Sequence, residues 1–408
     1  MIRHQVYFDT LGSMKEDSAS WRSVFAGLSV LRLVDSYSDS GSPVNSAGWA
    51  QLHSVRTAIE EMSEGDSIRG VLTTVLEELT KRNAIDDTVC SSVLAYGRAL
   101  DYEASWGLAT DVFSTVAKLA RPEKNPRLAV EANVAVGGAA RRNGDWETSA
   151  RAYSQAAYIA DTLGDRPGVL TVQVGIANTY LAKGNLPHAQ SILDDVIVQA
   201  RDQQLPDIQA YALHSRSSLA QRKGEKAEAV KLAYQALSLT TKSADRDVVL
   251  EDLAAGFSEL GMYDAARDAH LLLTATAQTK WVRWQATINL LELASQDGNV
   301  EAFDAYAAEL GKAPLGPWLR SYFLLFLGEG MERFGRYDTA GDVLMEAVEY
   351  STANQIHPAT FKAEAALVAL RSTKRSTATA PVFETIPNEV LAAAHAISEL
   401  RKAAFAPA

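Results

Sequence analysis

Residue types that commonly perform catalysis or bind metals are dispersed along this 408-residue chain. Gly328-Glu329-Gly330 lies inside a helical stretch and not after a strand, so it is not predicted to bind a phosphate. No Gly-x-Ser-x-Gly nucleophile turn occurs, and the single cysteine, Cys90, excludes internal disulfides and cysteine-based metal clusters. The histidines show no His-Glu-x-x-His spacing of zinc ligands; they are His4, His53, His188, His214, His270, His357 and His395. The sequence therefore predicts no enzyme, no metal site and no cofactor.

The overall charge argues against nucleic acid as a partner. The chain carries 39 Lys and Arg residues against 50 Asp and Glu residues, a formal net charge of −11. Nucleic-acid binders usually present a basic face that neutralises phosphates, and the basic residues here are scattered. No stretch approaches the ~18 apolar residues of a membrane helix, and residues 1–18 lack the apolar core of a signal peptide. We therefore expect a cytoplasmic protein without a membrane partner.

A repeated turn between two amphipathic segments organises most of the chain. A glycine after a helix adopts the left-handed conformation that ends it, and a polar residue can then cap the next helix. Successive turns are 40, 40, 40, 37, 37 and 37 residues apart. The copies are Ala104-Ser105-Trp106, Gly144-Asp145-Trp146, Gly184-Asn185-Leu186, Gly224-Glu225-Lys226, Gly261-Met262-Tyr263, Gly298-Asn299-Val300 and Gly335-Arg336-Tyr337. This spacing predicts an all-α chain built from helical hairpins.

Small and bulky side chains recur at fixed distances from each turn. Small residues lie seven positions before it, as at Gly137, and five positions after it, as at Ala189. Bulky residues such as Tyr153 follow further along and fill the space between hairpins. This order resembles the tetratricopeptide repeats over about residues 88–350, with a period longer than the usual ~34 residues. Kinesin light chains and the peptide-pheromone receptors of Gram-positive bacteria have similar longer helices. The sequence departs from the pattern at Phe303, Arg216 and Ser217.

The resemblance implies a right-handed α-solenoid of about seven to eight hairpins, in which the first helix of each hairpin lines a concave groove. In tetratricopeptide proteins the ligand usually lies in that groove. Counting back from each turn projects a set of side chains into it. They are Arg98, Tyr102, Arg141, Arg142, Asn178, Tyr211, His214, Arg222, Glu251, Asp252, Asn289, Glu292 and Glu329.

The projected charges suggest a groove that is polarised along its length. The first four repeats contribute arginines, and the last three contribute Glu and Asp residues. We therefore expect a ligand segment with one acidic and one basic end, because complementary charge orients a ligand and speeds its capture. A solvated helix face without a ligand is the alternative interpretation.

The two ends of the chain lack the turn pattern. We expect helices near residues 17–36, 48–63 and 66–82, either as a small N-terminal bundle or as degenerate repeats that cap the solenoid. The last helix, with its polar outer face, is predicted to cap the other end. The predicted divisions are residues 1–85 for the N-terminal helical region, 86–371 for the superhelix, 372–386 for a flexible linker, and 387–408 for the capping helix and tail.

Two functions fit this organisation. The first is a non-enzymatic scaffold or adaptor whose groove binds a protein or a peptide. The second is a regulator gated by a peptide or partner, in which the repeats sense a ligand and the N-terminal helices act on a target. The identity of the partner and the oligomeric state leave no pattern in the sequence.

Overall fold

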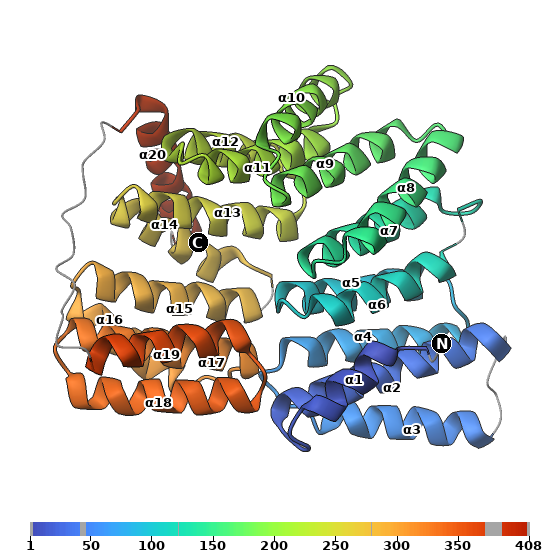
Figure 1. Cartoon of the computed structure of the whole chain (residues 1–408), viewed down its shortest axis with the longest axis horizontal. Helices are drawn as coiled ribbons and strands as arrows, with labels where there is room; N and C mark the ends of the chain where they lie inside the picture. Colours follow the sequence, from blue (N-terminus) through green and yellow to red (C-terminus); the bar gives the residue numbers. More distant parts are fainter. Residues whose placement is uncertain (1–2, 41–45, 121, 279, 372–385, 406–408) are drawn as a thin grey trace. The chain divides into compact units, whose positions relative to one another are not determined.

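The computed structural model describes residues 3–40, 46–120, 122–278, 280–371 and 386–405. These residues form α-helices and no strand (Figure 1), so the all-α prediction is confirmed. The chain divides into two compact units, which we describe separately. Unit 1 comprises residues 1–184 and 353–355, and unit 2 comprises residues 185–352 and 356–408. None of the described helices is both long enough and apolar enough to cross a membrane.

Unit 1 contains the first nine helices. They are α1 (Gln5–Ser13), α2 (Ala19–Ser40), α3 (Ser46–Glu60), α4 (Ser67–Arg82), α5 (Asp87–Tyr102), α6 (Trp106–Leu119), α7 (Pro126–Arg142), α8 (Trp146–Thr162) and α9 (Arg166–Ala182). From α4 onward, consecutive helices pack against one another. The core of this unit is continuous from Tyr7 in α1 to Val172 in α9. The N-terminal helices therefore share one core with the first hairpins.

Unit 2 contains the remaining helices. They are α10 (Leu186–Asp202), α11 (Pro206–Arg222), α12 (Lys226–Leu239), α13 (Ser243–Glu259), α14 (Tyr263–Thr276), α15 (Lys280–Gln296), α16 (Val300–Leu310), α17 (Pro317–Arg333), α18 (Tyr337–Ala353), α19 (His357–Arg371) and α20 (Asn388–Ala404). We call α5, α7, α9, α11, α13, α15 and α17 the first helices, because each precedes one of the repeated turns. Helices α6, α8, α10, α12, α14, α16 and α18 are the second helices.

The repeated turns have the predicted backbone. All six glycines of the pattern have a positive φ, between 72° and 80°, and Ala104 adopts the same region in the degenerate copy. Asp145, Asn185 and Asn299 each accept a hydrogen bond from the backbone N–H three residues later. Each turn therefore ends one helix and starts the next, as expected from the residues that form it.

Close packing in the hairpins explains the small residues. A Cβ at Gly137 would lie 2.8 Å from the ring of Tyr153, and a Cβ at Gly175 of the following helix 2.3 Å from it. The bulky residue thus occupies the space left by two glycines. In unit 2, Phe303 stands where the pattern has a small residue, and it is fully buried. Gly330 compensates, because a Cβ there would lie 2.2 Å from the Phe303 ring.

The N-terminal region contains a helix that the sequence did not suggest. The predicted helices near 17–36, 48–63 and 66–82 correspond to α2, α3 and α4, whereas α1 was not expected. Buried His4, just before α1, lies between two carboxylates: its Nδ1 is 2.5 Å from Asp111 and its Nε2 is 3.2 Å from Asp35. The hydroxyl of Tyr7 bonds that of Tyr96 at 2.9 Å. These contacts hold the N-terminal segment against α2, α5 and α6.

The C-terminal helix packs elsewhere than at the end of the repeats. We expected residues 387–408 to cap the array, but α20 packs against the second helices α14 and α12. Its buried stripe of Val390, Ala393 and Ile397 joins their apolar core, and Arg401 forms a 2.6 Å ion pair with Asp268. An apolar stripe with i, i+3 and i+7 spacing can pack into the groove between any two neighbouring helices, so the stripe did not specify where α20 would bind. Residues 372–385 of the predicted linker and 406–408 of the tail lie outside the described residues.

Candidate functional site: an acidic cavity between α13 and α15

In unit 1, ion pairs between neighbouring first helices use the projected arginines. Arg98 of α5 pairs with Glu131 of α7. Arg142 of α7 forms an ion pair with Asp101 of α5, and its Nε donates to a carboxylate oxygen of Asp101 at 2.9 Å. These acids neutralise the side chains from which we predicted the basic end of the groove. The hypothesis counted the arginines without the acids one repeat away, so the role of these two arginines in a basic end of the groove stays a prediction.

The other projected residues of unit 1 are less involved in such pairs. Tyr102 is 40% exposed at the end of α5. Arg141 is partly buried, and its Nε has no hydrogen-bond partner among the described residues. Asn178 lies on α9 and is also partly buried. Of the projected residues in unit 1, Arg98 and Arg142 thus form ion pairs with acids of neighbouring first helices.

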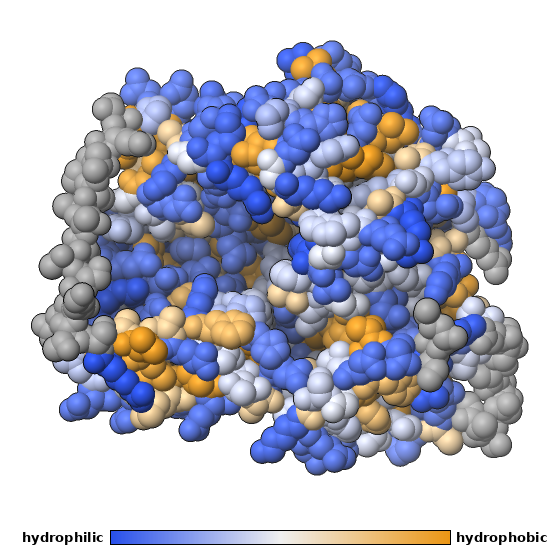
Figure 2. Space-filling model, in the orientation of Figure 1, coloured by the Kyte–Doolittle hydropathy of each residue, from blue (hydrophilic) through white to orange (hydrophobic). Residues whose placement is uncertain are grey.

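In unit 2, three of the four projected acidic residues line a cavity of about 410 Å³. The cavity lies between α13 and α15, where Figure 2 shows hydrophilic side chains on a recessed surface. Four of the projected residues line it together: Glu251, Asp252, Asn289 and Glu292. Its other lining residues are Ala255, Ser258, Glu259, His270, Leu293 and Gln296. We call this site the acidic cavity.

Glu251 is the carboxylate most affected by its surroundings in the acidic cavity. The pKa of Glu251 is raised to about 7, chiefly by burial and also by the neighbouring carboxylates Asp252 and Asp247, against a hydrogen bond from Asn289 that lowers it. Gln285 donates to Asn289 Oδ1 at 3.4 Å, which leaves the amide nitrogen of Asn289 for Glu251. Glu251 is thus held by an amide and faces other acids.

Two further carboxylates extend the acidic surface along the first helices. Burial and the carboxylate of Glu329 raise the pKa of Glu292, while Arg333 and Lys362 lower it. The pKa of Glu329 is also raised by burial, against the same two cations. Arg333 donates to Ser295 Oγ at 2.7 Å and lies 3.5 Å from Glu329. Positive charge is therefore present beside Glu329 of α17.

The remaining projected residues of unit 2 lie on α11. His214 Nε2 is 2.5 Å from a carboxylate oxygen of Asp252, which connects α11 to the wall of the acidic cavity. Tyr211 is 37% exposed on the same helix, and Arg222 is exposed at its end. The structure therefore links Tyr211 and Arg222 to this site only through their helix.

His270 is a cavity residue that the sequence did not reveal. It comes from the second helix α14, is only 6% exposed, and lines the cavity. Burial lowers its pKa to about 4, so the imidazole is neutral. Its Nδ1 has no hydrogen-bond partner among the described residues. Buried polar atoms are normally satisfied, and an unsatisfied one costs stability.

A second pair of neighbouring acids was also missed, in unit 1: Asp66 is buried and Glu103 is partly buried. Asp66 caps α4, and Glu103 follows α5. Burial raises the pKa of Glu103 to about 8, and the nearby Asp66 contributes. The hydroxyl of Ser67 donates to the Glu103 carboxylate. Acids at helix ends are usually exposed, so the burial of these two carboxyl groups could not be predicted from their residue types.

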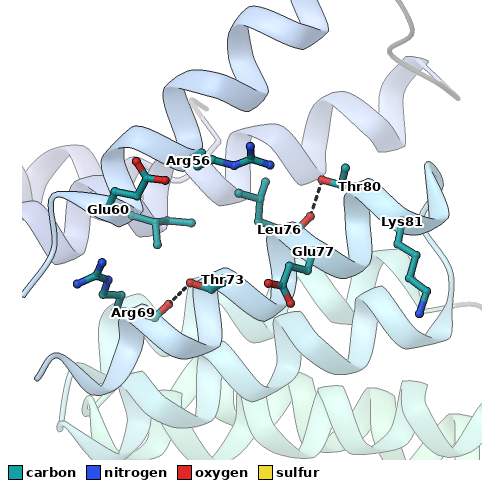
Figure 3. Close-up of a pocket in the computed structure, with 9 residues that line it drawn as sticks. Arg56, Glu60, Arg69, Thr73, Leu76, Glu77, Thr80 and Lys81 are labelled. Atoms are coloured by element: carbon teal, nitrogen blue, oxygen red, sulfur yellow. Dashed lines mark hydrogen bonds between the residues drawn. The ribbon is translucent and has the colours of Figure 1, made fainter. Parts of the chain in front are cut away.

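A larger cavity of about 630 Å³ lies between α3 and α4. Figure 3 shows Leu76 on its floor, with charged side chains of both signs around it. The two threonine hydroxyls in its wall bond the backbone of their own helix: Thr73 donates to Arg69 O at 2.9 Å and Thr80 to Leu76 O at 2.7 Å. Unlike His270, these hydroxyls have partners within the protein.

Comparisons with known proteins give weak likenesses. No family model matches the chain, and no curated protein matches its sequence. The crystal structure of NprR in complex with its cognate peptide NprX is 14% identical, with a TM-score of 0.44; the match covers 85% of this chain and 93% of that one. The apo form of the quorum sensor NprR from B. thuringiensis is 13% identical, with a TM-score of 0.43 and coverage of 85% and 92%. The Rap protein complexed with Competence and Sporulation Factor is 14% identical, with a TM-score of 0.34 and coverage of 86% and 98%. At these values the likenesses carry no conclusion about function.

Proposed function

We propose that this chain is a binding module of the tetratricopeptide type, which holds a segment of polypeptide on the first helices of unit 2. The observation that supports this most directly is the acidic cavity. Its wall combines Glu251, which faces other carboxylates, with His270, whose buried Nδ1 has no partner among the described residues. A bound ligand that donates hydrogen bonds would contact the carboxylate of Glu251 and the imidazole ring of His270, which both line the cavity.

A polypeptide segment fits the arrangement of polar groups along these helices. Tyr211 and His214 on α11, Glu251 on α13, Asn289 on α15 and Glu329 on α17 succeed one another at intervals of one repeat. An extended peptide offers a backbone N–H and C=O at each residue, which such side chains can bond. A side chain of the same peptide would then enter the cavity. Small-molecule sites also occur in cavities of this volume, but they do not require a succession of polar groups outside.

Selection from a phage-displayed library of random peptides would test the proposal. Peptides enriched on the wild-type protein should lose at least tenfold in affinity, about 1.4 kcal/mol, for the double variant Asn289→Ala, Glu292→Gln. The matched control is Glu349→Gln, which removes an exposed carboxylate from the second helix α18 of the same unit. The proposal fails if no peptide is enriched, or if enriched peptides bind the double variant and the control equally well.

A further inference from the structure

We propose that the acidic cavity takes one organic cation, an ammonium or guanidinium group, which Glu251, Glu292 and the imidazole of His270 hold. This inference rests on the proposed function in one respect: the cation is taken to be a lysine or arginine side chain of the bound polypeptide. A free alkylamine would offer the same chemistry, and the experiment below separates the two sources.

The charge of the cavity wall selects for a cation. Of the ten residues that line it, Glu251, Asp252, Glu259 and Glu292 are acids, and none is lysine or arginine. Burial raises the pKa values of Glu251 and Glu292, and a neighbouring carboxylate adds to the rise in each case, which outweighs the opposing effect of Arg333 and Lys362 on Glu292. An anionic ligand would add repulsion, whereas a cation would relieve it.

His270 provides a second and independent reason. A neutral imidazole has one nitrogen that accepts and one that donates a hydrogen bond. His270 is 6% exposed and lines the cavity, and its inaccessible Nδ1 has no partner among the described residues. As an acceptor, the other ring nitrogen, Nε2, would bond an N–H of the ligand, which ammonium and guanidinium groups supply in several directions. An apolar side chain would leave His270 unsatisfied.

The spread of the acids distinguishes an organic cation from a metal ion. In the part of the chain that the structure describes, no three His, Cys, Asp or Glu side chains converge closely enough to bind a metal. A metal ion needs several ligand atoms at about 2.0–2.6 Å from one point. An organic cation carries several N–H groups and can reach acids that lie further apart. The cavity of about 410 Å³ also has room for the alkyl chain of such a group.

Cation binding should release protons near neutral pH. Because the pKa of Glu251 is about 7, this acid is about half protonated at pH 7. A bound cation favours the charged carboxylate, so the proton leaves as the ligand enters. The binding-competent fraction rises from about one tenth at pH 6 to about nine tenths at pH 8, which predicts affinity about tenfold higher at pH 8.

The test measures binding of four pools of capped heptapeptides by isothermal titration calorimetry. Each pool is random at six positions, and its central residue is lysine, arginine, norleucine or glutamate. We expect the lysine or arginine pool to bind at least tenfold more tightly than the norleucine pool at pH 8. This preference should shrink by about tenfold at pH 6. It should disappear in Glu251→Gln, Glu292→Gln and persist in Glu349→Gln.

Butylamine serves as the probe for a free amine. If the lysine and norleucine pools bind the wild-type protein equally well, the proposed cation site is overturned, while the proposal of polypeptide binding stands. If butylamine binds with the same dependence on Glu251 and no pool binds, the cation stands and the polypeptide is overturned. If neither probe binds, both proposals are overturned. Because the comparison of lysine with norleucine uses the wild-type protein, the test does not depend on how well the variant folds.

Discussion

The two units place charge on their first helices in opposite ways. In unit 1, Arg98 and Arg142 reach acids on the neighbouring first helix, so positive and negative side chains neutralise each other. In unit 2, Glu251 on α13 faces Asp252 on its own helix, and across the cavity α15 contributes Glu292. The same repeat geometry therefore gives ion pairs between first helices in unit 1 and a cavity lined by several acids in unit 2. What differs is whether adjacent first helices carry charges of opposite sign.

Buried acids make the same contrast within the molecule. Glu103 in unit 1 has its pKa raised to about 8, and the hydroxyl of Ser67 donates to it. Glu251 in unit 2 has its pKa raised to about 7, and it lines an open cavity. A raised pKa by itself does not indicate a ligand site. The cavity beside Glu251, with the unsatisfied nitrogen of His270, is what distinguishes a site from a packed interior.

The largest effect is expected when a cation is built into unit 2. Ala255 is exposed on α13 and lines the acidic cavity. Ala255→Lys should place an ammonium group among the acids and reduce binding of the lysine pool about 100-fold, or roughly 2.7 kcal/mol. The built-in charge should also lower the pKa of Glu251. Ala255→Gln is the control for side-chain size, and equal losses in the two variants would contradict an electrostatic effect.

The next effect concerns packing, where unit 2 also departs from unit 1. Gly330→Ala should lower the free energy of unfolding by about 2 kcal/mol, because its Cβ would overlap the rigid, fully buried ring of Phe303. Chemical denaturation measures the difference. Gly341→Ala is the matched control, since the added Cβ there would meet the nearest side chain at 3.6 Å. Phe303→Leu should reduce the cost of Gly330→Ala, and additivity of the two changes would contradict the compensation.

The repeat could be predicted from the sequence because its physical causes are local. A glycine with positive φ, a capping Asp or Asn and a small residue seven positions earlier each act within one hairpin. The positive φ of Gly144 and Gly184 and the capping role of Asn299 could therefore be predicted from the sequence. The period also placed Glu251 and Asn289 on adjacent first helices, and the structure brings them into one cavity. Spacing alone was sufficient for that.

Other features depend on contacts between distant residues, and no period encodes them. Arg142 and Asp101 are 41 positions apart, so their pairing depends on how far each side chain extends. His270 enters the cavity from a second helix, which the register assigned to the far side of the hairpin. The packing of α20 on α14 uses an apolar stripe that would suit many helices. Each of these contacts forms between elements far apart in the sequence, and other surfaces of similar composition could have taken the same place.

The pH dependence of stability should separate Glu103 from Glu251. A raised pKa means that the folded state binds the proton more tightly than the unfolded chain does. The resulting stability is complete below the ordinary pKa of 4.5 and is lost as pH rises through about 8 for Glu103 and about 7 for Glu251. Glutamine mimics the protonated acid and escapes this loss. We expect the Tm of Glu103→Gln, relative to that of wild type, to be roughly 3–8 °C higher at pH 9 than at pH 5.

Ligand should affect only one of the two acids. Thermal unfolding with the lysine pool present should remove the alkaline advantage of Glu251→Gln, because a bound cation stabilises the wild-type carboxylate. It should leave the advantage of Glu103→Gln unchanged. If the pool acts on both variants, or if neither gains stability at high pH, the contrast between a packed acid and a ligand-facing acid is wrong.

The smallest effect is expected for the ion pair between Arg142 and Asp101, which joins two first helices of unit 1. Both side chains are partly exposed, 33% and 24%, so solvent screens their attraction. A double-mutant cycle with Arg142→Ala and Asp101→Ala should give a coupling free energy of about 0.5–1 kcal/mol by denaturation, weakened at 1 M salt. Neither variant should alter binding of the lysine pool. A coupling near zero would mean that these pairs neutralise the surface of unit 1 without stabilising it, and loss of peptide binding would extend the site beyond unit 2.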